Sequence, residues 1–136
     1  ELNSEGLEKD YFQYRISKSH YLMNQFDEAR EEYQHLLTDF PKSSFASRAQ
    51  FEIGSSYFMQ EKYGTAIEAL KMVMRTYPAT EMAWEADFLI AQAYEHQDQL
   101  KDALETYERL KAGRYPASNV LEVRIRELKR RMNKRK

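Results

Sequence analysis

The residue types that most often carry catalysis or bind metals are few in this sequence and widely spaced. The three histidines, His20, His35 and His96, have no histidine or cysteine one helical turn away, and the chain contains no cysteine. A metal site needs convergent ligands, so this spacing does not predict one. The four glycines are scattered, which does not fit a glycine-rich phosphate-binding loop. We therefore expect no bound metal and no cofactor.

Carboxylates are abundant, but they fall where solvent is expected. Pairs such as Glu31 and Glu32 lie in strongly charged segments. General acid–base catalysis needs a pocket that shifts pKa values, and nothing in the sequence indicates one. We predict that the protein is not an enzyme and that its function depends on a surface.

A repeated segment organises the chain. The segment 26–41 (FDEAREEYQHLLTDFP) recurs at 63–78 and at 100–116, and each copy ends in an aromatic residue followed by proline. Alanines recur in it with a period of 37 residues, at Ala29, Ala66 and Ala103. Larger side chains follow each alanine by four and by seven positions: Tyr33, Leu70, Tyr107, Leu36, Val73 and Leu110. These offsets place the residues on one face of a helix.

The segment before each alanine repeats as well. An isoleucine lies thirteen positions before each alanine, a small residue lies twelve positions before it, and a histidine or tyrosine lies nine positions before it. The residues concerned are Ile16, Ile53 and Ile90, then Ser17, Gly54 and Ala91, and then His20, Tyr57 and Tyr94. Each unit is therefore predicted to be two amphipathic helices joined by a short turn, in which the small residue and the alanine let the two backbones approach closely.

This order of residues resembles the tetratricopeptide repeat (TPR). The segment Ile53-Gly54-(x)2-Tyr57-(x)8-Ala66-(x)3-Leu70 is most similar to the TPR signature. The resemblance covers about residues 10–118 and implies an all-α fold, a right-handed α-solenoid of three TPR helix pairs. We expect repeats at about 10–43, 44–80 and 81–118 and a C-terminal capping helix at about 119–133, all in a single domain of residues 1–136.

Departures from the signature fall mainly in the first and third repeats. His20 takes the tyrosine position of the first repeat, and Ser17 and Ala91 take the glycine position of the first and third. The position of the signature tryptophan holds Gln13, Gln50 and Asp87.

Hydroxyl residues predict where the next helices start. Ser43, Thr80 and Ser118 each stand two positions after a proline, where a side-chain oxygen can cap a helix N-terminus. The next helices are therefore expected to start near Ser44, Glu81 and Asn119.

In TPR proteins the first helices of successive repeats line a concave groove, and the resemblance implies the same here. Tyr14, Phe51 and Phe88 recur at the 37-residue period, so an aromatic ladder is expected; packing inside the solenoid and exposure in the groove are both open for these rings. The implied partner-binding residues are Tyr11, Tyr14, Lys18, Arg48, Phe51, Ser55, Phe58, Met59, Glu85, Phe88, Gln92 and Glu95, with Tyr21, Leu22 and His96 beside them. TPRs of the carboxylate-clamp type have asparagine where this chain has Lys18, Ser55 and Gln92, which disfavours binding of chaperone C-terminal tails.

The linkers narrow the resemblance further. FPKSSFASRA and YPATEMAWEA are similar to the linkers of bacterial cell-envelope TPR proteins, such as the TolA-binding coordinator of the Tol-Pal system and the BamD-like lipoproteins. This resemblance implies a non-catalytic adaptor, located in the periplasm or cell envelope; a cytoplasmic location is the alternative. Because the sequence starts at Glu1, we expect a processed or truncated chain.

Charge is divided between the body and the C-terminus. Residues 121–136 carry eight basic and two acidic residues, a net charge of +6, and the remainder carries −7. A basic helix of this kind is typical of a solvated capping face, but it can also contact nucleic acid or an anionic membrane surface.

Three functions follow from these observations. The first is an adaptor that binds a protein or peptide partner in the groove. The second is a self-assembling scaffold, in which the acidic body of one copy meets the basic cap of the next. The third is an accessory to nucleic acid or a membrane surface, and a hydrolase or transferase ranks a distant fourth. No apolar run approaches the 18 residues of a membrane-spanning segment.

Overall fold

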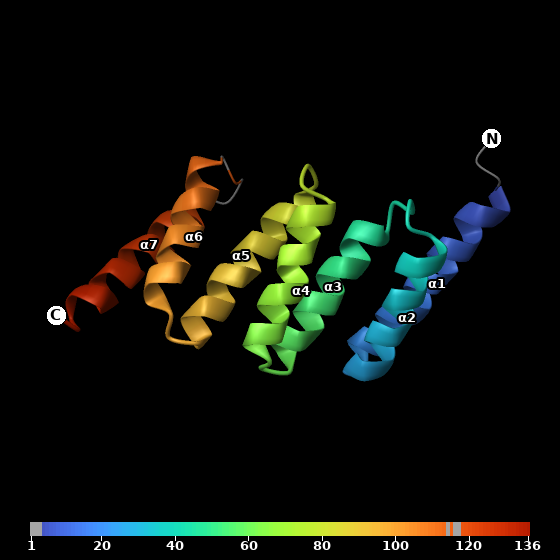
Figure 1. Cartoon of the computed structure of the whole chain (residues 1–136), viewed down its shortest axis with the longest axis horizontal. Helices are drawn as coiled ribbons and strands as arrows, with labels where there is room; N and C mark the ends of the chain where they lie inside the picture. The colour runs from blue at the N-terminus through green and yellow to red at the C-terminus, as the bar shows by residue number, and fades with distance from the viewer. Residues whose placement is uncertain (1–3, 114, 116–117) are drawn as a thin grey trace.

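The computed structural model describes residues 4–113, 115 and 118–136, and within them the only regular elements are seven helices. Six of the helices form antiparallel pairs and the seventh follows alone (Figure 1). Their bounds are α1 Ser4–Leu22, α2 Phe26–Asp39, α3 Ala46–Met59, α4 Tyr63–Thr76, α5 Glu81–His96, α6 Leu100–Ala112 and α7 Ser118–Asn133.

The helices pair through the residues that recur in the sequence. Ala29, Ala66 and Ala103 are completely buried, each near the start of the second helix of its pair. The larger residues that follow them are at most 4% exposed: Tyr33, Leu36, Leu70, Val73, Tyr107 and Leu110. The predicted helix pairs and their buried faces are thus confirmed.

Close approach within the second pair requires glycine at position 54. A Cβ atom on Gly54 would lie 2.6 Å from both Cγ and Cδ2 of Leu70, a distance that side chains do not tolerate. The helices α3 and α4 are therefore held together by a small residue on one helix and a branched residue on the other.

The turns inside the three pairs share one backbone conformation. Asn24, Glu61 and Asp98 lie 37 residues apart and have φ of 60°, 61° and 61°. The left-handed conformation ends the preceding helix, because a right-handed helix cannot continue through it. For this reason α1 ends at Leu22, two residues before Asn24.

The predicted helix caps have different outcomes. Thr80 caps α5, since its hydroxyl accepts a hydrogen bond from the Ala83 amide at 3.3 Å. The prediction for Ser43 is wrong: its hydroxyl accepts from the Phe45 amide and donates to Asp10, and α3 starts only at Ala46. α7 begins at Ser118, whose side chain lies outside the described residues.

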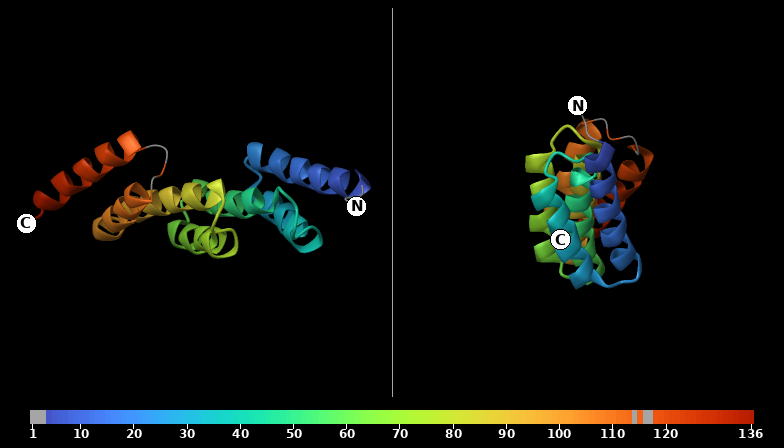
Figure 2. Two further views of the ribbon diagram at one scale, coloured as in Figure 1. Left: turned by 90° about the horizontal axis from the view of Figure 1, so that it is seen from above. Right: turned by 90° about the vertical axis from the view of Figure 1, so that its right-hand side faces the viewer.

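Neighbouring pairs stack into a curved ribbon. α2 packs against α3, α4 against α5, and α6 against α7, while α3 also touches α5. We call these contacts the first junction (α1 and α2 with α3), the second junction (α3 and α4 with α5) and the third junction (α5 and α6 with α7). Seen from above, α1 and α7 rise on one side of α3 and α5, and α4 lies on the other side (Figure 2). The ribbon therefore has a concave face, formed by α1, α3, α5 and α7.

The recurring isoleucines show the effect of position in the ribbon. Ile53 packs in a cluster with α2 residues and Ile90 in a cluster with α4 residues, and both are nearly buried. Ile16, in the same position of α1, is 48% exposed. In the described part of the chain, α1 packs mainly on α2, so no helix covers this side of it.

Candidate protein-binding groove

The concave face collects the residues that the repeat pattern assigned to a groove. Lys18, Ser55 and Gln92 lie at matching positions of α1, α3 and α5 and are half-buried. Tyr11, Arg48 and Met59 are more exposed, and the Met59 side chain is 59% accessible. The remaining predicted residues are half-buried: Tyr14, Phe51, Phe58, Glu85, Phe88 and Glu95.

A buried carboxylate organises the first junction. Glu52 of α3 is only 4% exposed, although it carries a charge. Lys18 donates to its Oε1 at 2.7 Å, the Tyr14 hydroxyl donates to the same atom at 3.2 Å, and the Tyr33 hydroxyl donates to Oε2. Three donors on α1 and α2 thus satisfy one acceptor on α3, which fixes the position of these helices.

This network changes the acidity of its tyrosines. Burial raises the pKa of Tyr33, and the hydrogen bond to Glu52 and the charge of that carboxylate raise it further. Burial, helped by the Glu52 charge and the hydrogen bond, raises the pKa of Tyr14 to about 12. Both hydroxyls therefore remain protonated donors over the whole physiological range.

The predicted aromatic ladder is packed against the body of the protein. Tyr14 stacks on Phe45, with ring centroids 4.9 Å apart. Phe51 packs against the buried cluster of the second repeat. Phe88 stacks on Tyr115 at 5.8 Å. The three rings are half-buried and do not form a free ladder.

A second set of rings lies near the ends of α3 and α5. The His96 ring stacks on Tyr63 at 4.6 Å with an interplanar angle of 6°, and Phe58 meets both rings edge-on. His96 remains exposed on its other side. Phe58 is consequently a half-buried support for His96 and only partly a contact surface.

The groove closes at its C-terminal end with a pocket between α5 and α7. The pocket has a volume of about 510 Å³ and is lined by Glu95, Asn119, Val120, Val123, Arg124 and Glu127. Val120 and Val123 are 45% and 61% exposed, so they present apolar surface to solvent. A second, polar hollow adjoins it and is lined by Gln92, Glu95, His96, Arg124 and Arg131.

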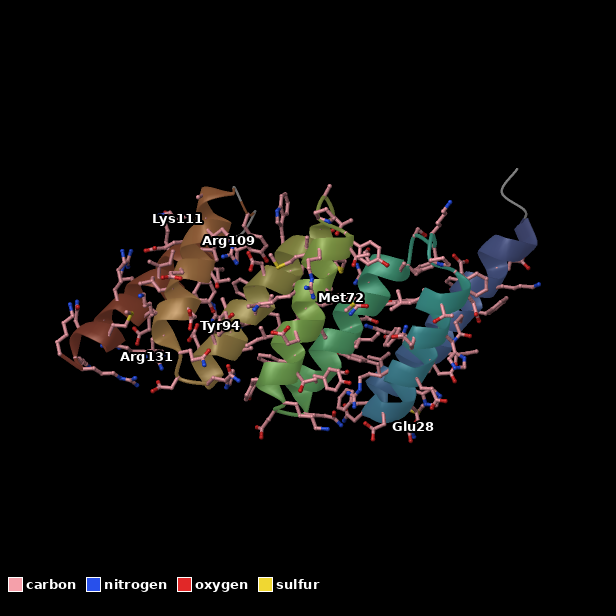
Figure 3. The ribbon with its side chains drawn as sticks, in the orientation of Figure 1. Glu28, Met72, Tyr94, Arg109, Lys111 and Arg131 are labelled. Carbon is pink, nitrogen blue, oxygen red and sulfur yellow. The ribbon has the colours of Figure 1, made fainter. Side chains whose placement is uncertain are left out.

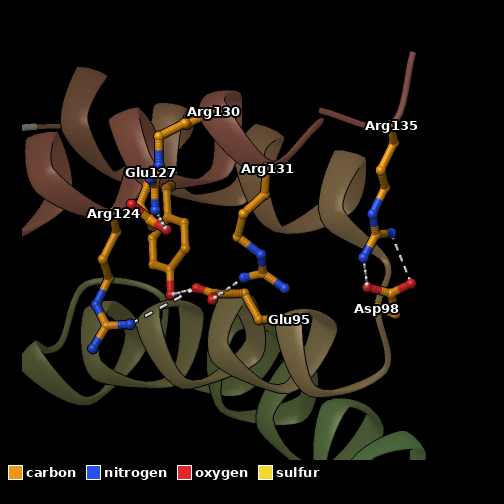
Figure 4. A network of polar contacts seen from close by, with 8 residues as sticks. Glu95, Asp98, Arg124, Glu127, Arg130, Arg131 and Arg135 are labelled. Carbon is orange, nitrogen blue, oxygen red and sulfur yellow. Dashed lines mark hydrogen bonds and ion pairs between the residues drawn. The ribbon is translucent and has the colours of Figure 1, made fainter. Parts of the chain in front are cut away.

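Glu95 is the centre of a polar network at the third junction (Figure 4). The Tyr107 hydroxyl donates to its Oε1 at 2.6 Å. Arg131 approaches Oε2 at 3.4 Å, and Arg124 lies 3.8 Å from Oε1. The Arg124 guanidinium also lies over the Phe88 ring, 5.3 Å from its centroid. One carboxylate therefore serves two arginines of α7, and neither pair has the short geometry of a bidentate contact.

Other basic residues of α7 and of the turn that follows it also meet carboxylates of the same chain. Arg135 makes two hydrogen bonds of 2.8 Å to Asp98, which lower the pKa of that carboxyl group. Lys129 lies 3.6 Å from Glu108 of α6. The basic face of the cap is thus partly neutralised by the body on which it packs.

The repeat pattern overlooked what α7 adds to the concave face. The groove residues were taken from the first helices of the three pairs, and no groove residue was assigned to α7. Extending the period by one repeat, with the extra residue of the third copy, puts Val123 in the position of Arg48 and Glu85. That extension is the signal in the sequence that would have identified Val123.

The described residues contain neither a group of metal ligands nor a membrane-spanning helix. No group of three or more histidine, cysteine, aspartate or glutamate side chains is arranged there to hold a metal ion. None of the described helices combines the length and apolar composition that a membrane crossing needs.

Solved structures with a similar fold are numerous. The TPR2AB domain of yeast Sti1, in complex with pHSP90, is 20% identical with a TM-score of 0.77; the match covers 97% of this chain and 49% of that one, so this chain spans about half its length. The type III secretion chaperone SycD of Yersinia enterocolitica, with a peptide of the translocator YopD, is 15% identical with a TM-score of 0.75, covering 97% and 98%. PcrH of Pseudomonas aeruginosa is 17% identical with a TM-score of 0.67, covering 94% and 92%.

Sequence comparison identifies the repeats directly. No curated protein matches the sequence significantly. Two tetratricopeptide-repeat profiles match, one over residues 14–80 and the other over residues 85–118, and together they span most of the chain. The buried alanines, the glycine at position 54 and the turns that recur every 37 residues agree with these matches. The chain belongs to the tetratricopeptide-repeat family.

Proposed function

We propose that this protein is a non-catalytic adaptor that binds a peptide or helix of a partner protein on its concave face. The observation that carries the proposal is the combination of exposed Tyr11, Arg48 and Met59 with an apolar pocket at the end of the same face. Tyrosine, arginine and methionine are enriched where proteins bind one another. The Sti1 and SycD structures, which hold pHSP90 and a YopD peptide, support the proposal because they have the same fold.

The form of the groove favours an extended or helical segment over a small molecule. Its residues come from the alternate helices α1, α3, α5 and α7, so a ligand that contacts all of them must be long (Figure 2). Half-buried rings such as Tyr14 and Phe88 give the floor a fixed shape, because each is stacked on a neighbouring ring. A floor that is already ordered loses little side-chain entropy when a ligand binds.

The test is a selection of binding peptides followed by matched substitutions. A phage-displayed library of random dodecapeptides is selected on the wild-type protein, and the affinities of enriched peptides are measured by fluorescence polarisation. Met59→Asp changes the concave face. Met72→Asp is the control, since Met72 is also an exposed methionine, 46% accessible against 59% for Met59, and lies on α4, outside the concave face (Figure 3).

We expect Met59→Asp to weaken binding about tenfold, as for the loss of one interface anchor, and Met72→Asp to leave it unchanged. An equal loss of affinity in the two variants, or peptides whose affinity changes in neither variant, would place binding away from the concave face. Circular dichroism confirms that both variants retain their helices.

Self-assembly through the acidic body and basic cap is the less favoured alternative. Arg131 of α7 and Arg135, in the turn that follows it, already meet Glu95 and Asp98 of their own chain, which reduces the charge offered to a neighbour. A mass in sedimentation equilibrium that rises with protein concentration and falls with added salt would favour this alternative.

A bacterial envelope assembly is the setting we propose for the interaction. The linkers after Pro41 and Pro78 support it through their resemblance to envelope TPR proteins. Fractionation of the source cells into periplasmic and cytoplasmic material, followed by immunoblotting, tests this part of the proposal.

A further inference from the structure

The pocket between α5 and α7 has one apolar wall. Val120 and Val123 lie on adjacent turns of α7 and are both substantially exposed. Isolated exposed valines are ordinary on a protein surface, but these two line a hollow of about 510 Å³. A hollow of this size holds one or two aliphatic side chains of a ligand.

Two arginines of the same helix add hydrogen-bond donors: Arg124 lines this pocket, and Arg131 lines the adjoining hollow. Among the described residues, the buried Nε of Arg124 has no hydrogen-bond partner. Its guanidinium lies 3.8 Å from Glu95, which is an ion pair but too long for a hydrogen bond. Arg131 reaches the same carboxylate at 3.4 Å. Stacking over Phe88 holds the Arg124 group in place, so its donors are already oriented.

The two arginines that line the pocket and the adjoining hollow share one carboxylate. Glu95 lies 3.8 Å from Arg124 and 3.4 Å from Arg131, while the other lining carboxylate, Glu127, accepts from Arg130 at 2.7 Å. His96 and Gln92, which line the adjoining hollow, add no negative charge. One guanidinium therefore lacks a carboxylate of its own at the edge of an apolar hollow.

We propose that this pocket recognises an acidic peptide segment. An aliphatic side chain of the segment lies against Val120 and Val123, and a neighbouring carboxylate binds Arg124 and Arg131. The inference rests on the proposed function and adds to it the chemical class of the ligand and the end of the groove where it binds. Charge-assisted hydrogen bonds from a guanidinium to a carboxylate are about twice as strong as neutral ones, so this contact provides selectivity.

The probe is a blocked decapeptide, GSGLDELGSG, titrated into the ¹⁵N-labelled full chain while the backbone amides of α5 and α7 are followed by NMR. Three comparison peptides separate the contributions: GSGLNQLGSG lacks the charges, GSGSDESGSG lacks the aliphatic side chains, and GSGLKKLGSG reverses the charge. GSGLNQL with a free C-terminus tests whether a terminal carboxylate serves as well as a side-chain carboxylate.

Substitutions test the arginines and the valines of the pocket separately. Arg131→Gln is expected to raise the Kd of GSGLDELGSG about tenfold, and Val123→Ser to raise it several-fold. Arg124→Lys keeps the charge but removes the forked donors, and it is also expected to weaken binding. Arg135→Gln is the matched control, because it removes the same charge from the turn that follows the same helix, outside the pocket, and it is expected to leave the Kd unchanged.

Several results would overturn the inference. They are equal binding of the neutral and acidic peptides, equal loss with Arg131→Gln and Arg135→Gln, or no amide shifts in α5 and α7 with any peptide. If peptides selected by phage display still bind and depend on Met59, only this inference fails. If no peptide binds in either experiment, the proposed function fails with it.

Discussion

The first and second junctions join equivalent repeats by different means. The first has an apolar cluster and, in addition, the buried Glu52 with its three donors. The second is apolar, with Ile67 and Leu70 of α4 packed against Ile90 of α5. Among the described residues, no side-chain hydrogen bond links α3 or α4 to α5 across it.

Two positions contribute to this difference, in addition to the Tyr21–Ser55 and Arg30–Ser56 hydrogen bonds that also cross the first junction. The residues that match Tyr33 and Glu52 in the next repeat are Leu70 and Leu89. A tyrosine and a carboxylate at these positions produce a directional contact, whereas two leucines produce a contact that depends only on buried area. Apolar burial supplies the stability common to both junctions, and the polar pair additionally fixes how the first two repeats are oriented.

The largest effect is expected from a cavity in the apolar junction. Ile90 is 2% exposed, and Ile90→Ala should lower the free energy of unfolding by about 3 kcal/mol, because it removes buried atoms and leaves a void. Urea titration measures the loss. The loss should be the same at low and high salt, and a strong salt dependence would contradict an apolar junction.

Removal of the buried carboxylate comes next. Glu52→Leu leaves the Tyr33 hydroxyl buried without an acceptor and should cost about 2 kcal/mol. The double variant Tyr33→Leu/Glu52→Leu gives the first junction the residues of the second, and it should regain much of that loss. Lys18 keeps access to water in both variants, as its side chain is 32% exposed. Additive losses in urea titration would show that the two residues do not act as a pair.

Alkaline pH provides a smaller, reversible test. An unfolded tyrosine loses its proton near pH 10, whereas the folded protein holds the Tyr14 proton to about pH 12 and the Tyr33 proton beyond it. The unfolded state thus binds fewer protons in this range, and stability should fall as the pH rises from 10 to 12. The melting temperature of Tyr33→Phe should fall less between pH 10 and pH 12 than that of wild type. The melting temperature of Ile90→Ala should fall as steeply with pH as that of wild type.

The smallest effect is expected at the end of the third junction. Arg135 and Asp98 form an ion pair that is open to solvent, and such pairs contribute little to stability. Arg135→Gln should accelerate amide hydrogen exchange in the last turn of α7 without changing the urea midpoint. A shifted midpoint would mean that this pair takes part in the cooperative core.

Periodicity predicted the fold because burial in a repeat protein follows the period. Ala29, Ala66 and Ala103 occupy one environment three times, so one pattern defines all three helix pairs. The pattern failed where the environment changes. Ile16 has no preceding helix to cover it, and the hydroxyl of Ser43 is bonded to Asp10, which the cap prediction did not consider.

The groove was less predictable than the fold. The equivalent positions in the other two repeats hold Arg15 and Leu89, so no repeated residue type marks Glu52 as buried. The three donors to Glu52 are brought together only by the folded structure. The placement of Phe88 against Tyr115 likewise depends on the linker that leads into α7. Residues that depend on non-repeating neighbours cannot be identified from the period.

The buried carboxylate also affects how the ribbon deforms. Hydrogen bonds resist rotation of one helix against another, whereas apolar faces can slide with little change in buried area. Elastic bending should therefore concentrate at the second junction, which acts as a hinge between two stiffer ends and sets the width of the concave face. Pulsed electron spin resonance with labels on α3 and α5 should give a broader distance distribution than labels on α1 and α3.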